Sequence, residues 1–282
     1  MTAASELSLS LNGFRLAAQQ WDGDGLPILA LHGWLDNAAS FAPLAPLLEQ
    51  PLCALDQAGH GASDHRPPAQ MLHLVDYIAD AHAALTSLGW SRCILMGHSM
   101  GAGIATLLAA ACPERFAALV LLDGLGPMAS PASELTSTLR KALDEHQQPV
   151  RPPTAQYRDL DEAVAARRRF DPTLSEASAA LLCERNLVAV DGGLAWRSDP
   201  RLRGTSAVRL TEPQVEAALS ALTMPTLLVW AQQGLRQRTG MAERVTLLPD
   251  ATEVEVAGHH HVHMNSPQPV AAAIRSFLAA RL

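Results

Sequence analysis

The chain has 282 residues, of which 48% are apolar, and its formal net charge at pH 7 is −7. This length fits one large domain or a core with an insertion, and the apolar content is ample for a substantial core. The acidic balance argues against nucleic acid and anionic membranes as partners. No apolar stretch of the sequence is long enough to span a bilayer, so we expect no membrane association.

The N-terminus and the cysteines favour a cytoplasmic location. Residues 1–6 show neither the basic segment nor the apolar core of a secretion signal. Two cysteines fall in expected strands and two in apolar helices: Cys53, Cys93, Cys112 and Cys183. Buried free thiols are the simplest interpretation of this spacing, and they are consistent with a reducing compartment.

The first elements predict a hairpin followed by a parallel sheet. Residues 6–20 alternate around Asn12 and Gly13, a strong hairpin turn signal. Strand and helix signals then alternate through Asp123, which is the pattern of a doubly wound parallel sheet. One helix is expected over about 72–88.

The apolar run 28–31 predicts a buried parallel strand, and His32, Gly33 and Trp34 follow it. This loop would bring the backbone N–H of Trp34 beside a nucleophile on a neighbouring strand, where it could help to hold a developing oxyanion. The alternative is a plain turn at the strand end, in which Gly33 supplies a positive φ.

The most informative stretch is the pentapeptide 97–101, G-H-S-M-G. It lies between the apolar run 93–96 and a small-residue helix that begins at 102. Strand, sharp turn and helix is the context in which G-x-S-x-G forms a nucleophile elbow, with Ser99 exposed at its tip. The backbone N–H of Met100 would be the second oxyanion donor. Because the pattern alone arises by chance in roughly one chain in ten of this length, its partners decide its meaning.

The segment 127–220 shows helical periodicity without a convincing strand, and strand signal resumes at Thr226. Within it, the arginines at 167–169 predict a solvated helix face rather than an anion site. Arg197 and Asp199 predict an ion pair, with recognition of a substrate carboxylate as the alternative. Helices are expected over 133–146, 154–170, 173–189 and 211–222.

A cluster of histidines follows the expected last strand at 254–257. A base in this loop fits the chain order nucleophile, acid, histidine. A histidine cluster could instead bind a metal, but no cysteine or acidic residue lies nearby at ligand spacing. We therefore expect no metal. The cluster comprises His259, His260, His261 and His263.

Three further stretches carry a resemblance to a known family: 31–38 (L-H-G-W-L-D-N-A), 122–127 (L-D-G-L-G-P) and 260–264 (H-H-V-H-M). With the elbow, they make the chain resemble the α/β-hydrolase superfamily over almost its whole length, and within it the serine hydrolase-like proteins. The resemblance implies a mostly parallel, doubly wound α/β-hydrolase sheet from residues 1–126 and 221–282. It also implies that 127–220 form a helical cap over the elbow, which would shape a pocket and exclude water.

The resemblance also selects the base. Superfamily members often end with G-G-H-x-x-H-x-E-x-P. Counting back from Pro267 places the base at His260, with His263 as the second histidine and His259 in a glycine's place. This register favours His260 over His259.

The usual acid is missing. In most of the superfamily it follows the penultimate strand, in a pattern like P-T-L-L-V-W-G-x-x-D, whereas residues 225–234 read P-T-L-L-V-W-A-Q-Q-G. Gly234 therefore occupies the acid position. One interpretation moves the acid to Asp123, which ends the preceding strand at the same edge of the sheet, as in some superfamily members. In the other, Asp123 only caps a turn and the protein is a weak or inactive hydrolase.

These residues predict a serine hydrolase that acts on a small carboxylic ester through an acyl-enzyme, without metal or organic cofactor. Ser99 would attack, His260 would move the proton and Asp123 would orient His260. The pocket for the small-molecule substrate is expected to involve His32, His98 and Met128. The alternatives are thioester or C–C bond hydrolysis, acyl transfer to an acceptor other than water, or a non-catalytic binding protein.

Overall fold

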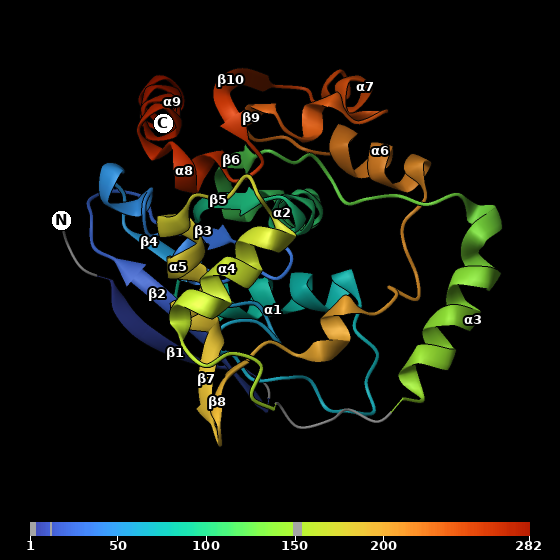
Figure 1. Cartoon of the computed structure of the whole chain (residues 1–282). Coiled ribbons are helices and arrows are strands. Elements are labelled where there is room, and N and C mark those ends of the chain that lie inside the picture. The colour runs from blue at the N-terminus through green and yellow to red at the C-terminus, as the bar shows by residue number, and fades with distance from the viewer. Residues whose placement is uncertain (1–3, 12, 149–153) are drawn as a thin grey trace.

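The computed structural model describes residues 4–11, 13–148 and 154–282. Its centre is an eight-stranded sheet in the order β1-β2-β4-β3-β5-β6-β9-β10 (Figure 1). β2 pairs antiparallel with β1 and β4, and all other neighbours pair in parallel, which confirms the predicted fold class. The strands span Ser5–Leu11 (β1), Phe14–Trp21 (β2), Ile28–Leu31 (β3), Leu52–Leu55 (β4), Cys93–His98 (β5), Phe116–Leu122 (β6), Thr226–Gln233 (β9) and Ala251–His259 (β10).

Helices cover both faces of this sheet (Figure 1). Buried side chains of α1, α2, α6 and α7 pack on one face, and those of α8 and α9 pack on the other. The helices span Leu74–Ser87 (α1), Met100–Ala111 (α2), Leu135–His146 (α3), Leu160–Phe170 (α4), Glu176–Asn186 (α5), Glu212–Ser220 (α6), Met241–Val245 (α7), Val262–Asn265 (α8) and Pro267–Arg281 (α9).

The two helical layers explain the continuous apolar runs of the central strands. Along β3, Leu29 and Leu31 belong to one core, and Ile28 and Ala30 belong to the other. Because successive strand residues point to opposite faces and both faces are covered, every position of such a strand has to be apolar. Because β3, β5, β6 and β9 pair in parallel, their carboxyl ends lie at one edge of the sheet. This edge positions the loops that follow the strands.

The N-terminal hairpin and the first helix form where the sequence predicts them. β1 and β2 pair from Ser5 with Gln20 to Leu11 with Phe14. Gly13 has a φ of +99°, as a tight hairpin turn requires, while Asn12, the other half of the predicted turn, lies outside the described residues.

Between β6 and β9 the chain contains strands as well as helices, which corrects the expectation of helices alone. Leu187–Val190 (β7) and Gly193–Trp196 (β8) pair antiparallel, so the helix expected over 173–189 ends at Asn186. Asp191 and Gly192, with φ +86° at the glycine, connect the two strands. Asp-Gly is a strong hairpin signal, and here it outweighs the helical periodicity on its N-terminal side.

Two predicted surface features of this segment also differ. Arg167 is buried, because it shares the inward face of α4 with Val164, and its guanidinium lies 3.0 Å from Asp36; the two arginines after it are exposed. Asp199 pairs at 2.6 Å with Arg201 rather than with Arg197. The Arg167–Asp36 pair joins segments 131 residues apart, whose proximity no local pattern reveals, whereas Asp199 and Arg201 lie in one segment.

Helix α3 stands at the margin of the molecule, apart from α4 and α5 (Figure 1). Of its side chains only Ala142 is buried, and Leu135 and Leu143 are largely exposed. Within the described ranges, no helix is both long enough and apolar enough to cross a membrane.

Replacing Leu95, which is fully buried on β5, tests the core that supports the elbow. We expect Leu95→Ala to lower the free energy of unfolding by about 2–5 kcal/mol, because a cavity remains where the side chain packed. Urea denaturation measures this change. The exposed Leu143→Ala control should stay within about 0.5 kcal/mol of the parent, and equal losses in both variants would contradict the assigned core.

Candidate functional site

Ser99 lies at the sharp turn between β5 and α2, with φ 54° and ψ −114°. This backbone conformation is strained for a residue with a side chain and is typical of functional sites. The turn also requires glycine on both sides: a Cβ on Gly97 would lie 2.4 Å from the carbonyl oxygen of Gly101, and a Cβ on Gly101 would lie 2.0 Å from that of Leu31. The G-x-S-x-G pattern is thus a packing requirement of the turn.

The side chains of Ser99, His260 and Asp123 form one hydrogen-bonded line. Nδ1 of His260 donates to Oδ2 of Asp123 at 2.6 Å, and Oγ of Ser99 lies 2.8 Å from Nε2 of His260. Because the carboxylate fixes the proton on Nδ1, Nε2 is free to accept from the serine hydroxyl. The Asp123 side chain is fully buried and the His260 ring is 29% exposed, so the line runs from the interior to the surface.

Gly234 explains how Asp123 reaches His260. Oδ1 of Asp123 accepts from the backbone N–H groups of Ala231 and Leu235 at 3.1 and 3.2 Å. A Cβ on Gly234 would lie only 2.1 Å from that same oxygen. The carboxylate of Asp123 therefore fills the space that any side chain at position 234 would need.

Backbone donors lie next to Ser99. Trp34, Ser99 and Met100 line the same cavity. Among the described residues, neither the N–H of Trp34 nor that of Met100 donates to a protein acceptor. Both groups are therefore available to a ligand atom, as an oxyanion hole requires.

His32 supports this loop from the interior and does not line the cavity, contrary to expectation. Its Nε2 accepts from the backbone N–H of Gln57 at 3.0 Å, and its Nδ1 donates to the carbonyl of Gly33 at 2.8 Å. Burial lowers the pKa of His32 to about 4, so the ring stays neutral and keeps both hydrogen bonds at neutral pH. His32 thus fixes the backbone that carries the Trp34 N–H.

His98 is also fully buried and lies behind the site rather than in the pocket. Its Nε2 donates to the carbonyl oxygen of His260 at 3.0 Å, which ties the end of β5 to the histidine loop. Burial and the neighbouring His263 hold the pKa of His98 well below its usual range. Of the three residues expected in the pocket, only Met128 lines the cavity.

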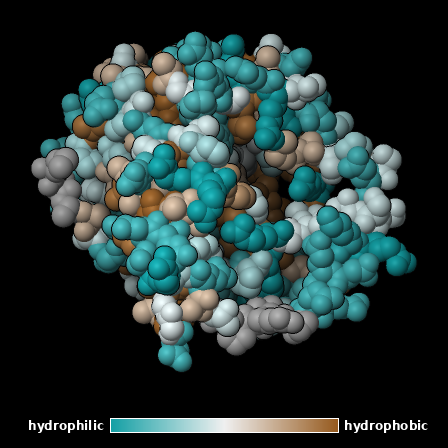
Figure 2. Space-filling model, viewed as in Figure 1, coloured by the Kyte–Doolittle hydropathy of each residue, from teal (hydrophilic) through white to brown (hydrophobic). Residues whose placement is uncertain are grey.

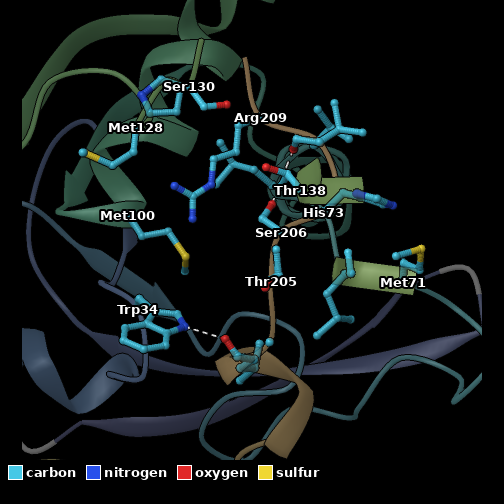
Figure 3. A pocket seen from close by; sticks show the side chains of 18 of the residues that line it. Trp34, Met71, His73, Met100, Met128, Ser130, Thr138, Thr205, Ser206 and Arg209 are labelled. Atoms are coloured by element: carbon cyan, nitrogen blue, oxygen red, sulfur yellow. Dashed lines mark hydrogen bonds between the residues drawn. The ribbon is translucent and has the colours of Figure 1, made fainter. Parts of the chain in front are cut away.

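The cavity that opens at Ser99 has a volume of about 1370 Å³. The cavity lies between the edge of the sheet and three other segments, which are the chain before α1, the helix α3 and the loop before α6 (Figure 3). Figure 2 shows the corresponding hollow with apolar walls on this face of the molecule. Trp34 forms part of the wall, and its Nε1 donates to the carbonyl of Leu202 at 2.8 Å.

A buried network of ion pairs includes His261, the residue after His260, and the sequence did not predict it. Asp36, two residues after Trp34, contacts Arg167 of α4 and Nε2 of His261, each at 3.0 Å. Nδ1 of His261 lies 3.0 Å from Asp171, at the end of α4. The network therefore links the loop after β3, the helix α4 and the residue that follows His260.

Charges within this network shift its pKa values. Burial favours neutral His261, yet the charge of Asp36 and the contact with Asp171 raise the pKa of His261 to about 9. Burial likewise opposes the ionised form of Asp36, but the positive charges of His261 and Arg167 hold its pKa well below the usual range. The group thus consists of two anions and two cations.

The expectation that no acidic residue lies near the histidines is wrong, because the fold brings one beside them. Asp36, 225 residues away from His261, joins His98 and His261 in a group whose possible ligand atoms all lie within 4.8 Å of one another. A metal would have to displace the proton of His261 and tolerate the Arg167 guanidinium at 3.0 Å from Asp36. The charges therefore fit an ion-pair network better than a metal centre.

Comparison with known proteins gives a consistent result. A family model described as alpha/beta hydrolase fold matches residues 27–267. A serine hydrolase-like protein of Danio rerio is 33% identical over 98% of this chain and 89% of its own length, and serine hydrolase-like protein 2 of Homo sapiens is 32% identical over 97% and 94%. The crystal structure of a hypothetical protein from Pseudomonas aeruginosa PAO1 superposes with a TM-score of 0.90 at 38% identity, covering 97% of this chain and 99% of that one.

Substituting Gly234 tests whether the space beside Asp123 is required. In Gly234→Ala the new methyl group displaces the carboxylate from His260, so we expect Ser99 to react with a fluorophosphonate roughly 100-fold more slowly, by loss of base assistance. Intact-mass spectrometry follows the labelling. Gln233→Ala, at the exposed neighbouring position, is the matched control, and parent-like labelling of Gly234→Ala would refute the steric argument.

The pKa of His261 predicts a pH-dependent contribution to stability. Because this pKa is raised from 6.5 to about 9 in the folded protein, the contribution is complete below pH 6.5 and disappears as the pH rises towards 9. The difference in unfolding free energy between the parent and His261→Gln should therefore shrink over this range. Urea titrations at several pH values measure it, with His259→Gln at an exposed position as control; a pH-independent difference would exclude a charged His261.

Proposed function

Because this chain belongs to the alpha/beta hydrolase fold family, we propose that it is a serine hydrolase that cleaves carboxylic esters through an acyl-enzyme intermediate. The observation that carries the proposal is the line from Asp123 through His260 to Ser99, which ends at a cavity beside two available backbone N–H groups. Nucleophile, base, orienting acid and oxyanion donors are the parts that acyl transfer needs.

In the first half-reaction, Oγ of Ser99 attacks the ester carbonyl carbon while Nε2 of His260 takes the hydroxyl proton. The carbonyl oxygen becomes an oxyanion, and the N–H groups of Trp34 and Met100 stabilise it, each by about 3 kcal/mol. The buried carboxylate of Asp123 stabilises the imidazolium that forms on His260. The intermediate then collapses: the alkoxide leaves with the proton from His260, and the acyl group stays on Ser99.

Water completes the cycle. His260 takes a proton from a water molecule that attacks the acyl carbonyl, and the same two N–H groups stabilise the second oxyanion. Collapse of this intermediate returns the proton to Oγ of Ser99 and releases the carboxylic acid. All proton transfers use side chains of this chain, so the mechanism calls for no metal or organic cofactor.

The segment 127–220 is proposed to act as a cap over this site. Met128 and the loop before α6 line the cavity, and Arg167 anchors α4 to Asp36 next to the oxyanion loop. Walls of this kind limit access of water to the acyl-enzyme and select the acyl or alcohol group.

Replacing Asp123 is the direct test of the mechanism. Asp123→Asn should leave the fold intact and lower kcat by roughly 10⁴-fold, because the amide no longer fixes the tautomer of His260. Hydrolysis of p-nitrophenyl acetate, butyrate and octanoate measures the effect. Asp22→Asn, at an exposed position, controls for the loss of one negative charge.

Two results would contradict the proposal in different ways. Parent-like turnover by Asp123→Asn would remove Asp123 from the mechanism. Absence of time-dependent fluorophosphonate labelling at Ser99 in the parent protein would exclude a serine hydrolase altogether and favour a non-catalytic binding protein.

A further inference from the structure

We infer that the cavity beside Ser99 accepts acyl esters that carry an anionic group at the end of an apolar segment, and that Arg209 binds this group. The inference deepens the proposed function and rests on it for the chemistry at Ser99. It names the substrate class that the walls of the cavity select.

The apolar part of the inference comes from the size and lining of the cavity. Its volume of about 1370 Å³ exceeds the roughly 300–1,000 Å³ of an ordinary small-molecule pocket, so a short ester would leave most of it unfilled. Four of the eight methionines in the chain line it: Met71, Met100, Met128 and Met241. Methionine side chains adapt to flexible apolar ligands, and these walls therefore suit an extended hydrocarbon segment.

The anionic group of the ligand is inferred from the positively charged side chains on the cavity walls, most of which already have a partner. Arg201 is held by Asp199 at 2.6 Å and by backbone carbonyls. Lys141 lies 3.9 Å from Glu145, and the guanidinium of Arg203 lies over the ring of Phe170. Each of these lining cations already has a partner within the protein.

Arg209 differs from Arg201 and Lys141 because, among the residues that the structure describes, it forms no ion pair and no side-chain hydrogen bond with a protein acceptor. It differs from Arg203, which also lacks an ion pair, because no aromatic ring of the described residues packs under its guanidinium. In Figure 3 its guanidinium points into the open space beside Met100, and Ser206 and Thr138 line the same cavity. A guanidinium binds a carboxylate or phosphate through paired, charge-assisted hydrogen bonds.

Two carboxylates also line the cavity, and neither competes directly for Arg209. Glu145 accepts from the backbone N–H of Thr205 at 2.6 Å and from its hydroxyl at 3.0 Å. Glu134 is exposed just before α3 and is not within ion-pair distance of Arg209. An anionic ligand group would supply the partner that the protein does not.

Paired neutral and anionic ligands test this inference. The Ser99→Ala variant, which cannot form an acyl-enzyme, is titrated calorimetrically with the monomethyl esters of succinate, adipate and suberate, each beside its dimethyl ester. We expect at least one monoester to bind about tenfold more tightly than its neutral partner, as a charge-assisted contact predicts. This preference should disappear when Arg209→Gln is added and persist in part with Arg209→Lys.

Arg203→Gln in the same background is the matched control, because it removes one positive charge from the same cavity and should leave the preference intact. Circular dichroism verifies that each variant folds. The inference is overturned if none of the monoesters binds more tightly than its diester, or if Arg209→Gln leaves the preference unchanged. It is equally overturned if Arg203→Gln abolishes the preference to the same extent, since the effect would then be a general one of charge.

Hydrolysis of the same esters by the parent protein separates this inference from the proposed function. If neither ester is cleaved, ester hydrolysis fails as a function, while the binding data still decide the anion site. If both are cleaved with equal kcat/KM and bind equally, the hydrolase proposal stands and the role of Arg209 is refuted. A higher kcat/KM for the monoester, lost in Arg209→Gln, supports both.

Discussion

The arrangement of the site depends on one steric constraint, the absence of a side chain at position 234. The carboxylate of Asp123 lies where a Cβ on Gly234 would be, and the backbone N–H groups around it supply its hydrogen bonds. Because β6 and β9 are parallel neighbours, an acid on either strand end can face His260. This chain places the acid on β6, and the glycine on β9 makes room for it.

A second set of interactions holds in place the groups around the hydrogen-bonded line of Asp123, His260 and Ser99. His32 fixes the loop that carries the Trp34 N–H, and His98 holds the backbone of His260. On the same side, Asp36 joins Arg167 and His261. Removing one member of a buried ion pair is costly, because it leaves an uncompensated charge. The network therefore couples the position of α4 to the loops on both sides of Ser99.

The cavity walls would add substrate selectivity to the reaction proposed at Ser99, because the fold alone does not specify a substrate. Ser99 lies at one end of it, methionines form much of its wall and Arg209 points into it. Under the proposed function, the line from Asp123 to Ser99 would act on many esters, and the depth and charge of the walls would distinguish among them. The segment between β6 and β9 would then select the substrate, and the sheet edge would supply the reacting groups.

The sequence by itself determined the parallel sheet and indicated the elbow at Ser99, because apolar runs and glycine requirements are local properties, while the preference for His260 over His259 came from the family resemblance. It also showed that Gly234 occupies the position of the usual acid, and it suggested Asp123 as the acid in its place. Only the tertiary structure could show that the two positions share one space. The same holds for the burial of Arg167 and the hairpin after Asn186, since both depend on contacts between segments far apart in the chain, which no local pattern records.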